Sequence, residues 1–401
     1  ISFIVSGHTV VMLDNKINKF FLNNLIFIYK PSYIYLQKKK EKKNLYKKIF
    51  NFKSYTLLKR KKDFNFHINT ELMLLMSTSG STGSPKFVRQ SYKNILSNTL
   101  NISKYLNINY QDTTITSLPI SYVYGLSVIN THLLNGAKIV LTNFSMIEKK
   151  FWKLIDIYKV NNFSGVPYSY SIVEKIFRRK VPSSLKYTTQ AGGKINEVLL
   201  KTLNKIYKKN KIKLFVMYGA AEATSRMSYL NWSKLEKKLG SVGKPIRGGN
   251  FYLLDEKDNI IKKSYKKGEL IYSGENVCMG YSEKLKDLSL PDLNKGILKT
   301  GDIAYKDNDG FYYIVGRKNR YAKIYGIRVD LSELESILSK KGIEAYMKEG
   351  DENKIDVYSK NKLKIKQGIK YISKITMINK NVFIIKDLSK KQLTSNLKYK
   401  I

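Results

Sequence analysis

A short run rich in glycine, serine and threonine, at residues 77–86, contains the groups that a polyphosphate needs. Gly80 and Gly83 allow the backbone to turn and to approach a ligand closely. Successive backbone N–H groups in such a loop form a nest that binds anions, and Lys86 adds a positive charge. The hydroxyl donors of the loop are Ser77, Thr78, Ser79, Ser81, Thr82 and Ser84.

A flexible Ser/Gly linker is the alternative interpretation of residues 77–86. It explains the glycines and serines, but not the apolar run before them or the Pro-Lys pair at the end. The spacing also differs from the G-x-x-x-x-G-K-S/T of a P-loop. We therefore predict a phosphate-binding loop of another kind.

Four further motifs follow this loop along the chain: Q-A-G-G-K-I at 190–195, Y-G-A-A-E-A-T at 218–224, T-G-D at 300–302 and G-R-K-N-R at 316–320. Together with the loop they resemble the motifs of the AMP-forming acyl-adenylating superfamily, which contains acyl-CoA synthetases, luciferases and adenylation domains. The resemblance covers most of the chain. It implies an α/β fold with a large N-terminal adenylate-forming domain of several subdomains, built from mixed sheets and helices (1–316), a hinge (317–319) and a small mobile α+β C-terminal domain (320–401).

The resemblance also assigns roles to single residues. Tyr218 would stack on adenine, because an aromatic face binds a purine through its area. Glu222 would hold Mg²⁺, a hard cation that prefers carboxylate oxygen, and Asp302 would accept hydrogen bonds from the ribose hydroxyls. The implied catalytic residues are Thr82, Lys86, Glu222 and Lys398. The implied ATP- and AMP-binding residues are Thr78, Ser79, Gly80, Ser81, Thr82, Gly83, Lys86, Gly192, Gly193, Tyr218, Gly219, Asp302 and Arg317.

Tyr122, Gly192 and Gly326 would line the pocket for the acyl group and the thiol. Purely structural alternatives stay open: Tyr122 also suits a buried aromatic residue at a helix start, and Q-A-G-G suits a plain turn from strand to helix. Amino-acid-activating relatives usually carry an aspartate near position 122. The aromatic segment here therefore argues against an ordinary α-amino acid and favours an aliphatic or aryl acid.

Three positions depart from the family pattern. Ala221 stands where a threonine usually binds the α-phosphate, and a hydrogen bond to a charged group contributes roughly 1.5–3 kcal/mol. We expect a slower enzyme, or compensation by Thr224 or a water molecule. Asn319 replaces the usual hinge residue. Lys398 is the C-terminal catalytic lysine if L-T-S-N-L-K at 393–398 is the matching segment, whereas another register places Asn396 there and leaves no lysine.

The implied activity is the ATP- and Mg²⁺-dependent conversion of a small carboxylic acid into an acyl-adenylate. Transfer to a thiol follows, either on coenzyme A or on the pantetheine arm of an acyl carrier protein. The alternative is a degenerate nucleotide-binding member with little or no ligase activity.

Hydrophobic periodicity predicts the elements that position these motifs. We expect strand, helix and strand in residues 1–36 and a lysine-rich surface excursion at 37–62. We also expect a Gly-kinked strand at 323–329, followed by a helix whose capping box joins Ser332 to Glu335. Other expected helices lie at 91–106 and 197–210, and other strands at 71–76, 113–119, 138–144, 186–193, 213–219 and 249–255.

Composition sets broader limits. A chain of 401 residues favours two or more domains. The formal net charge of +42 is spread along the chain together with an excess of Ile, Asn and Tyr, so we attribute it to compositional drift and predict no nucleic-acid partner. The alternative is a functional field that favours polyanionic partners such as ATP, coenzyme A or an acidic carrier protein. The single cysteine, Cys278, indicates a reducing cytoplasm. No apolar run is long enough for a membrane span. The start has no methionine and no charged leader, so we expect the usual first segment of the family to be missing.

Overall fold

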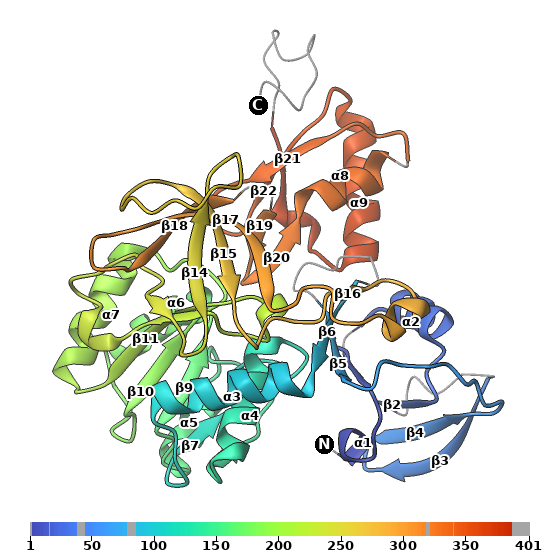
Figure 1. Ribbon diagram of the computed structural model, residues 1–401, viewed down its shortest axis with the longest axis horizontal. Helices are drawn as coiled ribbons and strands as arrows, with labels where there is room; N and C mark the ends of the chain where they lie inside the picture. The colour runs from blue at the N-terminus through green and yellow to red at the C-terminus, as the bar shows by residue number, and fades with distance from the viewer. Residues whose placement is uncertain are drawn as a thin grey trace.

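The computed structural model describes residues 2–15, 17–37, 45–77, 86–317, 321–339 and 341–386. Helices and sheets of mixed direction alternate along the chain, which confirms the α/β class (Figure 1). No helix of these ranges combines the length and the apolar character that crossing a membrane requires.

A seven-stranded sheet forms the centre of the larger part of the molecule. Five of its strands run parallel, and two antiparallel strands extend one edge. Its aromatic and aliphatic core includes Phe151, Phe163, Tyr170 and Leu203, which are fully buried. In sheet order the strands are β13 (Lys244–Pro245), β12 (Ser228–Leu230), β11 (Lys213–Tyr218), β10 (Tyr187–Gln190), β9 (Asn162–Gly165), β7 (Thr113–Ile115) and β8 (Lys138–Val140).

Five helices accompany this sheet, and those expected near 91–106 and 197–210 are confirmed. The first is capped by Ser91, whose side chain accepts a hydrogen bond from the N–H of Asn94, while the Asn94 side chain bonds back to the Ser91 N–H. The helices are α3 (Tyr92–Leu106), α4 (Val123–Leu134), α5 (Lys149–Ile157), α6 (Pro167–Phe177) and α7 (Glu197–Lys209).

A second sheet contains the strand that precedes the predicted phosphate loop and the strand that follows it. They pair antiparallel, with Ser77 opposite Phe87, so the two ends of the loop lie side by side. A distant segment pairs with the second of these strands and places Tyr281 opposite Val88. The sheet order is β1 (Val10–Met12), β5 (Leu72–Ser77), β6 (Phe87–Ser91) and β16 (Tyr281–Ser282).

A third, antiparallel sheet leads towards the C-terminal part. Its register places Asp302 directly opposite Arg317 on the neighbouring strand. Its strands are β14 (Asn250–Leu254), β15 (Gly268–Ser273), β17 (Ile297–Lys306) and β18 (Tyr312–Arg317).

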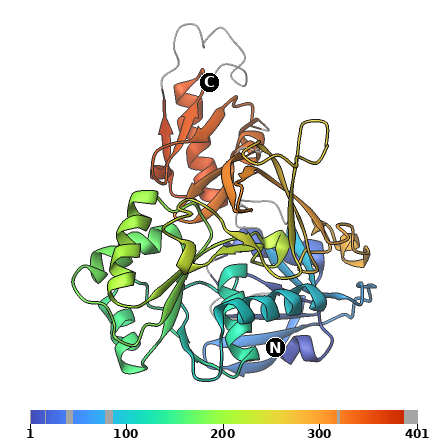
Figure 2. The same ribbon diagram turned by 60° about the vertical axis from the view of Figure 1, so that its left-hand side comes forward.

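The segment after residue 320 has a hydrophobic core of its own, formed by residues between Ala322 and Phe383. It stands at one end of the molecule in both ribbon views (Figures 1 and 2). Residues 318–320 lie outside the described ranges, and the predicted domain bounds and the hinge stay predictions. The elements are β19 (Tyr321–Ile324), β20 (Ile327–Asp330), α8 (Leu331–Ser339), β21 (Tyr346–Glu349), β22 (Ile355–Tyr358), α9 (Lys362–Thr376) and β23 (Phe383–Ile385).

Two predictions in this segment were wrong. The expected Gly-kinked strand is a β-hairpin, because Tyr325 and Gly326 have φ values of 50° and 87° and form a two-residue turn. The N-cap is not at the expected residue: Ser332 lies inside α8, and the N–H of Glu333 donates to the carboxylate of Asp330 at 3.0 Å. Glu335 instead accepts a hydrogen bond from the N–H of Met347 at 2.6 Å.

The N-terminal segment needs two further corrections. It begins with a short helix, α1 (Ser2–Val5), before the strand β1, and then continues with α2 (Lys19–Tyr29). The lysine-rich excursion contains two ordered strands, β3 (Tyr46–Phe52) and β4 (Tyr55–Arg60). They form a three-stranded sheet with the preceding β2 (Tyr33–Gln37), in the order β2, β4, β3. Most side chains of β3 are exposed at the sheet edge, where lysine is common, so hydrophobic periodicity could not reveal this strand.

Candidate functional site

A cleft opens at the carboxyl ends of β10 and β11, the edge at which parallel α/β sheets usually bind ligands. It encloses about 1720 Å³, with the open solvent at its mouth included. The walls come from the central sheet, from the second and third sheets and from the β19–β20 hairpin. The predicted site residues that the structure brings together here are Lys86, Tyr122, Gly192, Gly193, Tyr218, Gly219, Glu222, Asp302 and Gly326.

Tyr218 and Asp302 meet on one side of the cleft. Tyr218 is the last residue of β11, and its hydroxyl donates a 2.5 Å hydrogen bond to Oδ2 of Asp302 on β17. Thr300 supports this strand, because its hydroxyl donates to the carbonyl of Leu270 and accepts from the N–H of Asp302. An aromatic ring and a carboxylate held together in this way suit a nucleoside, with the base on the ring and the sugar at the carboxylate.

Tyr281 contacts both Glu222 and Lys86, and it is not among the predicted site residues. The hydroxyl of Tyr281 donates to Oε1 of Glu222 at 2.8 Å, and the ammonium of Lys86 lies 3.9 Å from the centre of the Tyr281 ring. Lys86 also lies 3.8 Å from the carboxylate of Glu283. The pairing of β16 with β6, almost two hundred positions away in the sequence, brings Tyr281 next to Glu222 and Lys86. A local sequence pattern cannot indicate such a contact.

Glu222 fits a magnesium ion that is shared with a phosphate ligand. In the described part of the chain no group of three or more His, Cys, Asp and Glu side chains could hold a metal by itself. Magnesium in nucleotide sites is usually bound through one or two carboxylates together with substrate phosphates. Glu222, the carboxylate of the cleft that Tyr281 joins to Lys86 at the end of the predicted phosphate loop, agrees with that pattern.

The glycines of the predicted site have packing roles of their own. A Cβ atom at Gly219 would lie 1.7 Å from the carbonyl oxygen of Ser225, so the turn after β11 requires glycine whether or not a ligand binds. Gly192 has a φ of 81°, and a Cβ there would lie 2.7 Å from the hydroxyl oxygen of Tyr122. At Gly193 it would lie 2.9 Å from Cγ of Pro167. The plain-turn interpretation of Q-A-G-G therefore stays open beside the ligand-binding one.

Tyr122 borders the cleft just before α4 begins. Burial, with a smaller contribution from Tyr124, raises its pKa to about 12. The phenol is therefore neutral at physiological pH and serves as a wall rather than as a base. The β19–β20 hairpin approaches from the other side, where a Cβ at Gly326 would lie 3.2 Å from the side chain of Val166.

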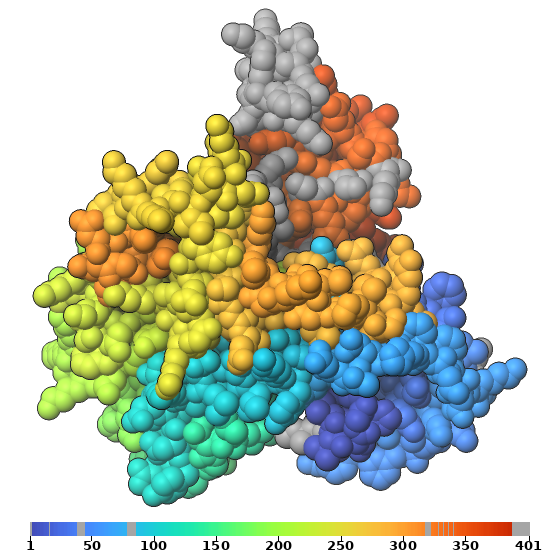
Figure 3. Space-filling model, in the orientation of Figure 1, coloured from blue at the N-terminus to red at the C-terminus, as the bar shows by residue number. Residues whose placement is uncertain are grey.

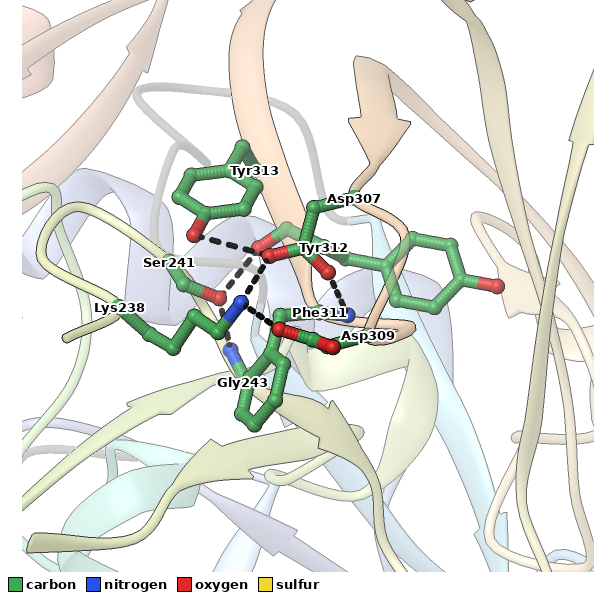
Figure 4. A network of polar contacts seen from close by, with 8 residues as sticks. All are labelled: Lys238, Ser241, Gly243, Asp307, Asp309, Phe311, Tyr312 and Tyr313. Carbon is green, nitrogen blue, oxygen red and sulfur yellow. Dashed lines mark hydrogen bonds and ion pairs between the residues drawn. The ribbon is translucent and has the colours of Figure 1, made fainter. Parts of the chain in front are cut away.

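A polar network fixes another wall of the cleft, residues 240–242 (Figure 4). Lys238 pairs with Asp307 at 2.8 Å and also with Asp309. Burial alone would raise the pKa of Asp307, but hydrogen bonds from Lys238 and from the Phe311 N–H outweigh burial and hold that pKa below its usual range. The network therefore attaches this wall to the turn between β17 and β18.

Several predicted residues lie outside the described ranges, or have side chains that do. The backbone of Arg317 belongs to β18, but its side chain is not described. The roles of all predicted site residues stay predictions. Those wholly outside the described ranges are Thr78, Ser79, Gly80, Ser81, Thr82, Gly83, Asn319 and Lys398.

Comparison with known proteins shows what this arrangement resembles. A 2-succinylbenzoate–CoA ligase of Geobacillus sp. (strain WCH70) is 29% identical over 269 residues, which are 67% of this chain and 53% of the relative. The chain thus spans about half the length of that relative.

Two solved structures of o-succinylbenzoate CoA synthetase from Bacillus subtilis have similar folds. One, a doubly substituted variant bound with its product analogue OSB-NCoA, is 24% identical with a TM-score of 0.67 and covers 82% of this chain and 70% of its own. The other, in complex with the acyl-adenylate intermediate OSB-AMP, is 25% identical with a TM-score of 0.57 and covers 80% and 67%.

A family model described as AMP-binding enzyme matches residues 5–282, well over half of the length. This match agrees with the order of the motifs along the chain and with the cleft at the carboxyl ends of β10 and β11. The chain belongs to the AMP-binding enzyme family.

Proposed function

We propose that this protein uses ATP to activate a carboxylic acid as an acyl-adenylate and then transfers the acyl group to a thiol, releasing AMP and pyrophosphate. The observation that carries the proposal is the convergence of Lys86, Tyr218, Glu222 and Asp302 on one cleft from four separate segments. The ligase activity named for the relatives and the acyl-adenylate named for a solved structure support it.

The first step is an in-line displacement at phosphorus. An oxygen of the substrate carboxylate attacks the α-phosphorus of ATP, and the bond to the β-phosphate oxygen breaks. Negative charge grows on the departing pyrophosphate, and the ammonium of Lys86 would stabilise that charge. Glu222 would hold a magnesium ion, which would supply positive charge to the phosphate oxygens. Thr82 and the rest of the 77–86 loop would supply further donors.

Tyr218 and Asp302 fix the nucleotide while this happens. The ring of Tyr218 supplies a face for the base, and the carboxylate of Asp302 accepts hydrogen bonds from the ribose hydroxyls, with Arg317 as a further contact. A hydrogen bond already joins the two side chains, so the site is formed before the ligand arrives. Positioning of this kind lowers the entropic part of the barrier.

The second step breaks the mixed anhydride. The sulfur of the thiol attacks the acyl carbonyl carbon, AMP leaves with the bonding electrons, and the thiol proton passes to solvent. We propose coenzyme A as the acceptor because the relatives are named as CoA ligases, while carrier-protein pantetheine stays the second candidate. The C-terminal part would turn about residues 317–319 between the steps, and Lys398 would act in the first. The cytoplasmic location stays a prediction.

Acid-dependent release of pyrophosphate across a carboxylate library tests this function. Lys86→Ala and Glu222→Ala are each expected to lower kcat/KM at least a hundredfold, because each removes a charge that acts on the leaving group. Lys93→Ala is the matched control: Lys93 pairs with Glu275 at 3.1 Å on the surface, outside the cleft, and its loss should leave turnover unchanged. No acid-dependent pyrophosphate from a folded protein that binds ATP would favour the degenerate alternative.

A further inference from the structure

The short turn that carries Glu222, residues 221–226, has an unusual backbone. It follows β11, and the φ values of Thr224 and Ser225 are 58° and 136°. Positive φ values are uncommon for residues other than glycine, and for a β-branched residue such as threonine they are costly. Backbone in such a conformation persists only where the surrounding structure over-determines it. The Glu222 turn therefore depends on contacts from other parts of the chain.

Two side-chain amides on one continuous segment bond to the backbone of the Glu222 turn. Nε2 of Gln90, on β6, donates to the carbonyl of Ala221 at 3.0 Å. Asn98, in the helix α3 that follows, donates to the carbonyl of Arg226 at 2.8 Å and accepts from the N–H of the same residue at 3.3 Å. Both amides are only 1% exposed, so water has little access to these bonds.

The segment after β15 holds the same turn from another side. The side chain of Asn276 donates to the carbonyl of Ala223 at 2.8 Å, and its backbone carbonyl accepts from the hydroxyl of Thr224 at 2.6 Å. The N–H of Cys278 donates to the carbonyl of Glu222 at 2.8 Å. The strained turn is thus held by hydrogen bonds from two distant segments.

Gln90 connects the Glu222 turn to the predicted phosphate loop. Lys86 directly precedes β6, and Gln90 is the fourth residue of that strand. All five residues of β6 are buried, and the strand is paired on both sides, with β5 and with β16. The Gln90 bond ends at Ala221, the residue before Glu222. One paired strand and one hydrogen bond therefore couple the backbone positions of Lys86 and Glu222.

A metal shared between a carboxylate and a triphosphate needs such a coupling. Mg²⁺ demands near-ideal octahedral geometry with short bonds to oxygen, so the carboxylate and the phosphate oxygens must keep a narrow range of separations. Groups that buried hydrogen bonds lock in place keep this geometry. A strained turn that lost one of its hydrogen bonds would relax towards another backbone conformation and displace Glu222.

We propose that Gln90 is a positioning residue for Mg²⁺-ATP: its hydrogen bond to Ala221 holds the strained turn in the conformation in which Glu222 meets the metal on the triphosphate. This inference rests on the proposed function and adds a residue that acts from outside the cleft. Gln90 lines a separate small cavity together with Asn98 and Thr224. A purely structural role would affect stability alone, whereas a positioning role also reduces the contribution of the metal to ATP binding.

Calorimetry tests the inference without catalysis. The Kd for ATP is measured with Mg²⁺ and with EDTA, and the ratio of the two values reports how much the metal strengthens binding. Gln90→Met keeps the length of the side chain but removes the donor, and we expect this ratio to fall about three- to tenfold, the size of one net hydrogen bond. Asn98→Leu releases the other end of the turn and should lower the ratio in the same direction. The Kd for AMP, assigned to Tyr218 and Asp302, should stay unchanged in both variants.

Asn162→Leu is the matched control for loss of a buried amide. Asn162 is 2% exposed, and its amide donates to Oδ1 of Asn161 at 3.0 Å. It is the first residue of β9, at the amino end of the strand, whereas the cleft opens at the carboxyl ends of the neighbouring parallel strands. The control should lower the free energy of unfolding without changing the ratio.

An unchanged ratio in Gln90→Met, or an equal fall in Asn162→Leu, would overturn the role of Gln90 and leave the proposed function standing. Native protein whose ATP affinity does not respond to Mg²⁺ would overturn both the placement of the metal at Glu222 and this inference. Native protein that binds Mg²⁺-ATP but releases no pyrophosphate with any acid would overturn the proposed function, and the ratio would still decide the role of Gln90. Kd is independent of the folded fraction, so a partly unfolded variant also gives a decision.

Discussion

The hydroxyl of Tyr281 donates a hydrogen bond of 2.8 Å to the carboxylate of Glu222. The same ring lies under the ammonium of Lys86, so one tyrosine contacts both residues that we assign to the triphosphate and its metal. Tyr281 is therefore a positioning residue: it orients Glu222 through the hydroxyl and Lys86 through the ring.

The two contacts of Tyr281 can be separated by substitution. Tyr281→Phe keeps the ring but removes the donor, and we expect the Mg²⁺ concentration for half-maximal activity to rise about three- to tenfold, since a net hydrogen bond contributes about 1 kcal/mol. Tyr281→Leu also removes the ring, and should raise KM for ATP in addition. An unchanged magnesium dependence in Tyr281→Phe would show that Glu222 needs no such orientation.

Asp302→Asn tests the sugar site. The substitution removes the charge that accepts two hydroxyl hydrogen bonds, and we expect the Kd for AMP, measured by calorimetry, to rise about ten- to a hundredfold. Asp309→Asn is the matched control, because Asp309 is an exposed carboxylate that pairs with Lys238 away from the base and sugar. Equal AMP affinity in native protein and Asp302→Asn would show that the ribose does not bind at Asp302.

Cys278 is expected to be inert in the native protein. It is fully buried, and burial raises the pKa of its thiol to about 12. The thiolate is the reactive form, so a thiol reagent at pH 8 should modify the protein only after unfolding in urea. The raised pKa also means that the contribution of the protonated thiol to stability is complete below about pH 8.5 and is lost as the pH rises towards 12. Rapid native labelling at pH 8 would contradict the buried position.

His132 should make the fold sensitive to acid. Burial lowers its pKa, and Nδ1 lies 2.7 Å from the carbonyl of Val128, whereas Nε2 has no partner among the described residues. The unfolded chain therefore binds a proton at a higher pH than the native chain. Stability should fall as the pH drops below about 6.5, by up to about 1.4 kcal/mol per pH unit.

Urea unfolding at pH 7.5 and pH 5.5 measures this effect. His132→Gln replaces the imidazole with a neutral amide, so its free energy of unfolding should fall less over the same interval than that of the native protein. An equal fall in both would assign the acid sensitivity to other groups.

Local patterns were sufficient for much of the fold and for the individual site positions. The unbroken apolar run of β5, the capped helix after Ser91 and the glycines at 192 and 193 are visible within a few residues of sequence. The contacts of Tyr281 with Glu222 and Lys86 were not predicted, because they depend on the pairing of β16 with the distant strand β6. The β19–β20 hairpin was mistaken for a kinked strand, because Tyr325 adopts a left-handed conformation that tyrosine rarely shows.

The pairing of Asp302 with Arg317 has a mechanical consequence. The carboxylate assigned to the sugar and the last described residue before the C-terminal part belong to neighbouring strands joined by backbone hydrogen bonds. A shift of either strand must be shared by the other. The position of the carboxylate at the proposed sugar site therefore cannot change independently of the direction in which the chain leaves the larger part of the molecule.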